Sequence, residues 1–384
     1  MLNVYFDNAS TTMPSDEARA AAAAAMAESW ANPSSAHGPG RRAAGLLARS
    51  REAVGEALGA DPGDIYFTSG GTEGDNWALR SGAFLGRHRG RHIITSRTEH
   101  AAVLDTARYL GTQGWEVTYL DPDNTGAVPL EALASALRED TVLVSLMLVN
   151  NETGAVNPVA RASELIREKS PAAVFHVDAV QAFLKIPFTP KKLGADLVTV
   201  SSHKIHGPKG AGALYIRRGL RLPAMVTGGG QEGSLRPGTE AMPAIAGFAA
   251  AAREGKANMA ENMARVTAVR DRVRELVSEY LPEAVFIGGG SPHILSLSLP
   301  GYRSEVLMSW LDGAGICVSR SSACKRGARS HVLEAMGLRS DVIDGAIRLS
   351  FSGYNTLPEA EYFAKTLQEA AVRLRTTVKR GGKR

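Results

Sequence analysis

The stretch ADLVTVSSHKIHGPKG, residues 195–210, joins an apolar run to a loop that carries a lysine. Residues 195–202 are rich in apolar and β-branched side chains, which is typical of a strand buried on both faces of a parallel sheet. Lys204 follows this strand directly. Because ligands of open α/β sheets bind beyond the carboxyl ends of the strands, we expect Lys204 to face a binding site. The alternative is an exposed lysine in a surface loop.

Six more strands are predicted around this one, with helical stretches between most of them. This alternation is a βαβ pattern, and it predicts an α/β fold with a mostly parallel seven-stranded sheet covered by helices. The six strands are expected at residues 64–69, 91–96, 115–120, 141–149, 172–179 and 212–218.

The pattern changes after residue 240. A long helical stretch crosses an expected domain boundary near Gly255, and short strands then mix with helices, which predicts a smaller α+β domain. The strands are expected at residues 293–300, 316–319 and 346–352, and the helices at residues 303–312 and 357–376.

The composition is that of a soluble globular protein, with 384 residues, 44% of them hydrophobic and 22% charged. Two cysteines, Cys317 and Cys324, cannot form a disulfide framework, so we expect a reducing compartment. The first residues lack the basic region and apolar run of a signal peptide, and the alanine run at 20–25 is typical of a helix with acidic residues in its first turn. We therefore expect a cytoplasmic protein without a membrane span.

The net charge of +5 raises the question of a nucleic-acid partner. The basic residues are spread along the chain, with small clusters at residues 87–91 and in the C-terminal tail. No groove-reading motif accompanies them, so we expect solvated basic residues and no direct nucleic-acid partner.

Asp178 ends the apolar strand at residues 172–179 and needs a partner if it is buried. A protonated pyridine nitrogen is one such partner. An aspartate on a ring nitrogen, together with a lysine Schiff base, is the pairing expected for pyridoxal phosphate (PLP). The alternative for Asp178 is the N-cap of the following helix.

The segment TSGGTEGDN, residues 68–76, is a candidate anion site. A strand ends, two glycines follow, and Thr72 opens a helix whose backbone amides and hydroxyl form a cradle. Gly71 and Thr72 would then hold the phosphate of PLP. The alternative is an ordinary turn between a strand and a helix.

Three polar residues lie at other strand boundaries or inside strands. His100 opens a helix after the strand at 91–96, where it is placed either to stack on a cofactor ring or to cap the helix. Asn151 also follows a strand, so it is expected either to bind the cofactor or to form an Asx-turn. Arg348 is a lone charge in an apolar strand, which requires either a substrate carboxylate or an acidic side chain as partner.

The two cysteines lie in different surroundings. Cys317, in the apolar stretch AGICVS, is predicted to be a buried structural cysteine. Cys324 lies in SSACKRGARS, residues 321–330, among small, polar and basic residues that do not suit a core position.

The chain resembles, almost from end to end, the cysteine desulfurases of the NifS/IscS kind, which are PLP-dependent enzymes of fold type I. No single string carries the resemblance, but their number and order are specific. The strings are YFDNASTT (5–12), NPSSAHGPG (32–40), FTSGGTEGDN (67–76), TEHAAV (98–103), VNNETG (149–154), HVDAVQ (176–181), SSHKIHGPKG (201–210), GGGQEGSLRPGT (228–239), SRSSAC (319–324) and HVLEAMG (331–337).

The resemblance implies a large PLP-binding domain of residues 13–255 and a small domain of residues 1–12 and 256–384 that carries the Cys324 loop. It also implies a cofactor-binding role for most of the polar residues above. By this resemblance, Lys204 is expected to bind PLP covalently, Asp178 to pair with the pyridinium nitrogen, Gln181 to hydrogen-bond the phenolic oxygen, His100 to stack on the ring and take part in acid/base chemistry, and Asn151 to contact the cofactor.

Phosphate and substrate contacts are implied in the same way. Thr239 matches a residue that reaches the phosphate of the partner subunit's cofactor, so a homodimer is implied. The positions that match phosphate-binding residues are Gly71, Thr72, Ser201 and His203, and those that match substrate-carboxylate contacts are Asn32 and Arg348.

Cys324 matches the catalytic cysteine. The implied reaction converts L-cysteine to L-alanine and leaves a persulfide on Cys324 for a sulfur-acceptor protein of Fe–S cluster assembly or tRNA thiolation. No resident metal is implied, although Cys324 is a candidate for a transient Fe–S ligand. The segment KRGARS after Cys324 is shorter and more basic than in long-loop members.

Selenocysteine lyase, another aminotransferase-like enzyme and a non-catalytic relative are the alternative functions. Cys324 argues against the aminotransferase.

Overall fold

The structure is a computed structural model that describes residues 3–320 and 329–381. Its largest element is a seven-stranded sheet with the strand order β2-β8-β7-β6-β5-β3-β4. The strands are β2 (Ile65–Thr68), β3 (His92–Ser96), β4 (Glu116–Leu120), β5 (Thr141–Met147), β6 (Val174–Asp178), β7 (Leu197–Ser201) and β8 (Gly212–Ile216). Every neighbouring pair from β7 to β4 is parallel, while β8 is antiparallel to both β7 and β2. The predicted mostly parallel sheet is therefore confirmed.

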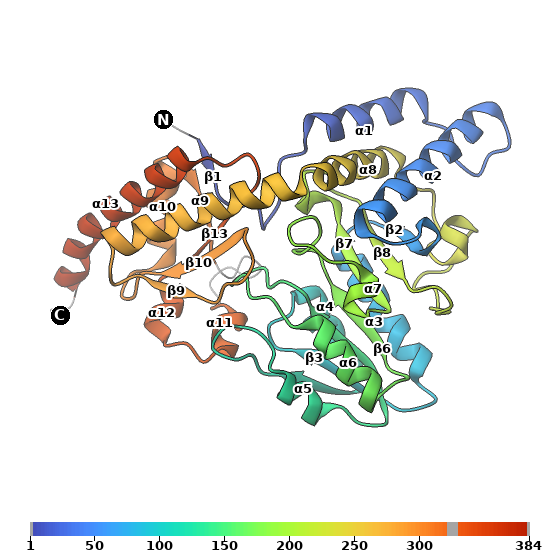
Figure 1. The fold of residues 1–384 in the computed structure, drawn as a ribbon, viewed down its shortest axis with the longest axis horizontal. Helices are drawn as coiled ribbons and strands as arrows, with labels where there is room; N and C mark the ends of the chain where they lie inside the picture. The colour runs from blue at the N-terminus through green and yellow to red at the C-terminus, as the bar shows by residue number, and fades with distance from the viewer. Residues whose placement is uncertain (1–2, 321–328, 382–384) are drawn as a thin grey trace.

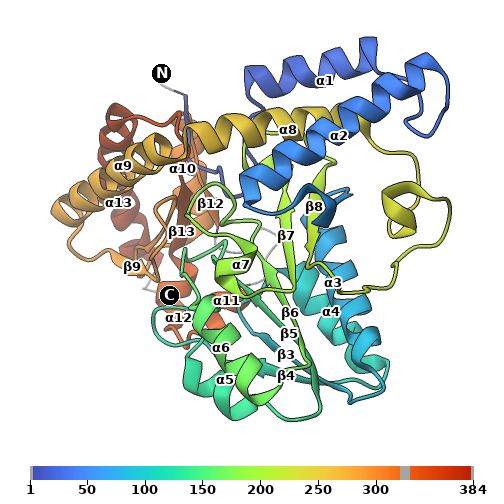
Figure 2. The same cartoon turned by 45° about the vertical axis from the view of Figure 1, so that its right-hand side comes forward.

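Helices cover both faces of this sheet (Figures 1 and 2). The side chains of the strands divide between two cores, one against α3 and α4 and the other against α2, α6 and α8. The helices of this part are α1 (Asp16–Glu28), α2 (Gly38–Leu58), α3 (Gly71–Gly86), α4 (Ala101–Thr112), α5 (Leu130–Ala136), α6 (Val159–Lys169), α7 (Pro190–Leu193) and α8 (Met242–Ala257).

The remaining residues form a second, smaller unit with its own core. A four-stranded antiparallel sheet with the order β12-β13-β10-β9 packs there, beside the parallel pair β1-β11. Its helices and strands are α9 (Met259–Tyr280), α10 (Ser304–Gly313), α11 (His331–Ala335), α12 (Ser340–Asp344), α13 (Leu357–Gly381), β1 (Val4–Tyr5), β9 (Val285–Ile287), β10 (Ile294–Ser298), β11 (Ile316–Cys317), β12 (Ser319–Arg320) and β13 (Ala346–Ser350).

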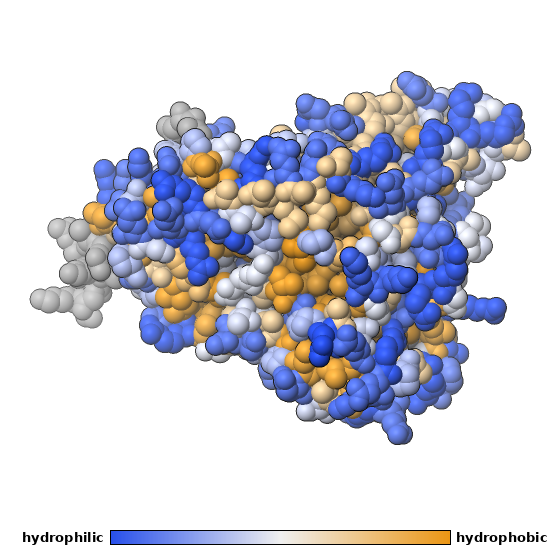
Figure 3. All heavy atoms as spheres, viewed as in Figure 1, coloured by the Kyte–Doolittle hydropathy of each residue, from blue (hydrophilic) through white to orange (hydrophobic). Residues whose placement is uncertain are grey.

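Two segments connect these units. Val4 and Phe6, at the start of the chain, belong to the core of the smaller unit, so the chain passes into the larger unit only after them. The long helical stretch is two helices, α8 and α9, which meet at Asn258. In Figure 3, hydrophobic side chains gather near the centre of this face, while hydrophilic ones cover most of its periphery. Within the described residues, every helix is too short or too polar to cross a membrane.

The backbone of β8 passes unusually close to the turn that precedes α3. A Cβ atom added to Gly212 would lie 2.7 Å from Gly70 Cα and 2.8 Å from Val200 O. Both neighbours are backbone atoms, which cannot rotate away as a side chain does. Glycine at this position therefore lets β8 support the turn at Gly70.

Gly212→Ala is expected to lower the free energy of unfolding by about 1–3 kcal/mol, because it overpacks this contact. Urea unfolding of the purified variant measures the change. Gly111→Ala, in α4, is the matched control, since an added Cβ there meets nothing within 4 Å. A Gly212→Ala variant as stable as the Gly111→Ala variant would contradict the proposed role of this contact.

Candidate active site

A cavity of about 280 Å³ opens where the parallel strands end. Strands β5, β6 and β7 deliver Met147, Asp178 and Ser201 to it, and the register pairs Met147 with Asp178 across neighbouring strands. Most sequence-predicted site residues line this one cavity: Gly71, Thr72, His100, Asn151, Asp178, Gln181, Ser201, His203, Lys204 and Arg348.

Lys204 closes a short 3-10 turn, Ser202–Lys204, directly after β7. Its Nζ donates hydrogen bonds to the carbonyl oxygens of Ala9 and Ser10, both at 2.7 Å. The amine therefore lies between the end of β7 and the N-terminal segment. It lines the cavity, so Lys204 is not the exposed lysine of a surface loop.

Asp178 is the last residue of β6 and is 5% exposed. One carboxylate oxygen accepts a hydrogen bond of 2.9 Å from Val180 N–H, which forms an Asx-turn. In the described part of the chain no helix begins here, so Asp178 is not a helix N-cap. Burial raises the pKa of Asp178, and the nearby His100 and Lys204 oppose that shift. A cation in the cavity would hold this carboxyl in its charged form.

The start of α3 has the geometry expected of the anion cradle that the sequence predicts. Gly70 has φ +152°, a value that favours glycine, and a Cβ on Gly71 would lie 2.9 Å from Val180 Cγ2. The amides of the first helical turn have no partners within the helix and therefore attract an anion. Ser201 Oγ, at the same end of the sheet, is buried without a hydrogen-bond partner among the described residues. These groups fit a phosphate.

Two histidines border the cavity. His100 Nδ1 accepts the N–H of Ala102 at 3.1 Å, so His100 caps α4 as well as lining the cavity. Burial lowers the pKa of His100. His203 contacts Thr11 through Nδ1 and Oγ1 at 3.1 Å, and burial lowers its pKa to about 4.

Arg348 lies in β13 and is 2% exposed. Its guanidinium donates to Asn151 O and Asp7 Oδ1 at 2.8 Å and to Ser10 Oγ at 2.6 Å. The structural ion pair considered from sequence is therefore present, with Asp7. The guanidinium also lines the cavity, and its Nε is buried without a partner among the described residues.

Asn151 lines the cavity, but the Asx-turn in this segment belongs to its neighbour Asn150. Asn150 Oδ1 accepts from the N–H groups of Glu152 and Thr153 at 2.9 and 2.8 Å. The side chain of Asn151 is therefore not the one that forms the Asx-turn, and it lines the cavity.

Sequence reasoning missed Asp75 and Glu99. Asp75 is 1% exposed, lines the cavity and lies 3.6 Å from His176 Nε2. It follows Gly71 by four residues in α3, a spacing that places both on one helix face and was visible in the sequence. Glu99, which precedes His100, accepts Ser96 O–H and Met147 N–H at 2.8 and 2.9 Å, and burial raises its pKa to about 8.

Other predicted residues lie elsewhere. Asn32 and Thr239 both line a separate hollow, beside the exposed Trp30, and do not reach the cavity of this chain. Cys324 lies outside the described residues.

The prediction for Cys317 is wrong, because this residue is exposed. Successive side chains of a strand point to opposite sides. In β11, Ile316 takes the inward position in the core, so Cys317 points outward. The apolar neighbours of Cys317 correctly indicated a strand but did not indicate which side each residue faces.

Comparison with known proteins agrees with this fold, which is that of the α/β enzymes of fold type I. The model of the aminotransferase class-V family matches residues 4–363. Cysteine desulfurase IscS of Methanosarcina thermophila is 38% identical over 377 residues, covering 97% of this chain and 93% of the relative. Cysteine desulfurase IscS of Serratia proteamaculans (strain 568) is 41% identical, covering 90% and 86%.

Two solved structures are also similar. A NifS-like protein superimposes with a TM-score of 0.91 at 39% identity, covering 97% of this chain and all of the other. A NifS-like protein from Rickettsia africae ESF-5 gives a TM-score of 0.87 at 30% identity, covering 96% and 99%. The chain belongs to the aminotransferase class-V family and, within it, to the NifS/IscS-like cysteine desulfurases. This family is PLP-dependent.

The raised pKa of Glu99 predicts a pH-dependent stability. The folded chain keeps a proton on Glu99 up to a pKa of about 8, whereas an unfolded glutamate loses it near its ordinary pKa of about 4.3. The folded state therefore binds more protons in this interval, and Glu99 makes stability fall as the pH rises from about 5 to about 8.

Glu99→Gln, which imitates the neutral carboxyl, is expected to flatten this fall. Thermal unfolding at several pH values measures it, with the exposed Glu283→Gln as control. Equal slopes for Glu99→Gln and the wild-type chain would contradict the buried, protonated state of Glu99.

Proposed function

We propose that this chain is a cysteine desulfurase that holds PLP on Lys204 and passes the sulfur of L-cysteine to Cys324. The observation that carries the proposal is the meeting of three groups in one cavity: the amine of Lys204, the buried carboxyl of Asp178 and the anion cradle at the start of α3. An amine, a carboxylate and a cradle suit the aldehyde, the ring nitrogen and the phosphate of PLP. The names of the relatives favour this activity over selenocysteine lyase or aminotransferase.

The bound cofactor would supply an electron sink for an amino acid joined to it. Asp178 would hold the ring nitrogen in its protonated form, because a cation beside a buried carboxylate stabilises both charges. Gln181 would donate from its amide to the phenolic oxygen. Gly71, Thr72, Ser201 and His203 would hold the phosphate, and Asn151 would contact the cofactor.

Substrate binding would use Arg348 and proton transfer would use Lys204 and His100. Arg348 already has a fixed orientation, and its Nε is available to a substrate carboxylate. His100 is expected to be neutral at pH 7, since burial lowers its pKa. Its Nδ1 accepts from Ala102 N–H, so the ring proton lies on Nε2, which can donate it in proton transfer. The amine of Lys204, once released from the cofactor, would take the proton from the α-carbon of the substrate, deliver a proton to the β-carbon and return one to the α-carbon.

Cys324 would act as the nucleophile through its thiolate. The thiolate attacks the sulfur of the bound cysteine, the bond between that sulfur and the β-carbon breaks, and a proton replaces the sulfur. The sum is L-cysteine plus the Cys324 thiol giving L-alanine plus a Cys324 persulfide. An acceptor protein of Fe–S cluster assembly or tRNA thiolation would then take the terminal sulfur. This thiol chemistry favours the reducing cytoplasm.

The proposal includes a homodimer, in which Asn32 and Thr239 would serve the partner's cavity. They lie together beside an exposed tryptophan, Trp30, which is 72% exposed, and beside Met26, which is 60% exposed. Large exposed apolar side chains of this kind are common at protein interfaces. We also propose the domain division 13–255 against 1–12 with 256–384, which the two separate cores support.

Lys204→Ala and Cys324→Ala are expected to fail differently. Lys204→Ala should purify without the yellow colour of bound PLP and lose desulfurase activity by a factor on the order of 10³ or more. Cys324→Ala should stay yellow and release no sulfide above background. Absorption spectra, sulfide and alanine are measured after addition of L-cysteine and a reductant. A yellow Lys204→Ala protein, or a Cys324→Ala protein as active as the wild type, would refute the assignment.

Arg348→Lys is expected to raise the KM for L-cysteine about tenfold, because a lysine amine cannot keep the ion pair with Asp7 and also present a charged N–H donor to a carboxylate, as Nε of the guanidinium does. Arg339→Lys is the control, since Arg339 is exposed and pairs with Asp341. Steady-state kinetics on both variants, with melting temperatures, separate substrate binding from folding. An unchanged KM in a folded Arg348→Lys protein would remove Arg348 from the substrate site.

A further inference from the structure

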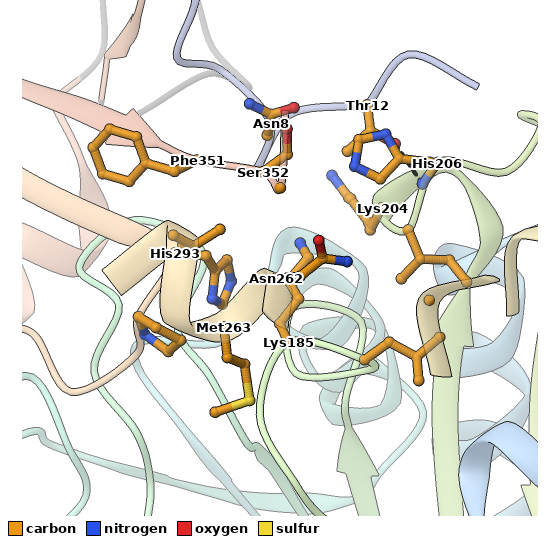
Figure 4. Close-up of a pocket in the computed structure, with 16 residues that line it drawn as sticks. Asn8, Thr12, Lys185, Lys204, His206, Asn262, Met263, His293, Phe351 and Ser352 are labelled. Atoms are coloured by element: carbon orange, nitrogen blue, oxygen red, sulfur yellow. Dashed lines mark hydrogen bonds between the residues drawn. The ribbon is translucent and has the colours of Figure 1, made fainter. Parts of the chain in front are cut away.

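A second and smaller cavity, of about 60 Å³, lies behind Lys204 (Figure 4). We call it the rear chamber. Lys204 lines both the rear chamber and the active-site cavity, so it separates the two. The rear chamber contains a second lysine, Lys185, which the proposed reaction does not use. Its polar lining residues are Asn8, Thr12, Lys185, Lys204, His206, Asn262, His293 and Ser352.

The backbone holds Lys185 towards this chamber at a cost. Leu184, which precedes it, has φ +58°, in the left-handed region that non-glycine residues avoid. The Leu184 side chain packs against Gly255, where an added Cβ would lie 2.9 Å from Leu184 Cδ1. Packing therefore maintains a strained backbone that directs the next residue inward. Lys185 is partly exposed as a whole, while Figure 4 shows its side chain directed into the chamber.

The surroundings of the Lys185 amine disfavour a positive charge on this amine. Burial, together with the positive charges of Lys204 and Arg348, lowers the pKa of Lys185 to about 7. No aspartate or glutamate lies among the described residues that line the chamber. His293 and His206 also face it, with pKa values that burial lowers, and Glu254 acts on His206 from a neighbouring hollow. An amine without a carboxylate partner indicates a use as a hydrogen-bond donor.

The partner of this amine is Gln181. Lys185 Nζ lies 3.3 Å from Gln181 Oε1, and Gln181 Nε2 donates to Ala9 O at 2.8 Å. Ala9 O also accepts from Lys204. An amide has one acceptor end and one donor end with two N–H groups. With Oε1 turned to Lys185 and one N–H on Ala9, the second N–H remains for the active-site cavity, which Gln181 also lines.

We propose that Lys185 is a positioning residue, which holds the amide of Gln181 so that its NH₂ group faces the active-site cavity. The proposal rests on the proposed function, in which this NH₂ group meets the phenolic oxygen of PLP. Without Lys185, Gln181 Oε1 loses its donor, and rotations that turn the NH₂ group away from the cofactor become accessible.

The test is a double-mutant cycle of Lys185→Met, Gln181→Met and the double variant, each loaded with PLP. The dissociation constant of PLP and the visible absorption maximum are measured at about pH 8.5, where an amine with a pKa near 7 is mostly neutral and exerts little charge. At this pH, lysine and methionine at position 185 differ mainly in the hydrogen bond, because the two side chains have a similar length. Lys191→Met is the control at an exposed lysine.

Lys185→Met is expected to weaken PLP binding about fivefold, in the range of one hydrogen bond, and to shift the absorption maximum in the direction of Gln181→Met. The double variant should match Gln181→Met, because both changes remove the same contact. Lys185→Met behaviour equal to that of Lys191→Met, or full additivity in the double variant, would overturn the proposal.

Circular dichroism verifies that each variant folds. If Lys185→Met does not fold, Lys185→Leu takes its place. A wild-type chain that binds no PLP would defeat the proposed function itself, whereas a yellow, active wild type with an indifferent Lys185→Met variant defeats only the role of Lys185.

Discussion

The hydrogen bonds from Lys204 to the carbonyl oxygens of Ala9 and Ser10 connect the two units of the chain at one point. The segment that provides these carbonyls continues in both directions. Asp7 and Ser10 accept from Arg348 of the smaller unit, and Gln181 of the larger unit donates to Ala9. The cavity therefore has walls from both units, and its geometry depends on how this N-terminal segment is held.

The sheet sets the other half of the geometry. Parallel strands end at a common edge, so Met147, Asp178 and Ser201 reach the cavity from neighbouring strands. Several buried carboxyl groups lie near this edge of the sheet. Burial raises the pKa of Asp75, Asp178 and Glu99, and the carboxyls reinforce one another. Such a site favours a bound cation, and in this account the ring nitrogen of the cofactor supplies that charge.

Much of the fold could be predicted from the sequence, because buried parallel strands are continuous apolar runs that are easy to recognise. All seven strands of the large sheet are present within a few residues of the expected bounds. The two-residue β1 and the three-residue β9 were missed, since so short a strand has no pattern of its own. The wrong prediction for Cys317 has a related cause, because in a two-residue strand nothing in the sequence indicates which side faces the core.

Only some residues of the candidate site could be predicted from the sequence. Residues at the end of a strong strand or just beyond it, such as Asp178 and Lys204, could be located from the strand pattern alone. Lys185 could not, because its importance depends on the left-handed backbone at Leu184 and on a contact with Gln181 that only the folded chain forms.

The central claim, that Lys204 is the attachment point of PLP, is tested most directly by reductive trapping. The PLP-loaded chain is treated with borohydride, digested and mapped by mass spectrometry. The account predicts a pyridoxyl group on the peptide that contains Lys204. A group on the peptide that contains Lys185, or on no peptide at all, would contradict it.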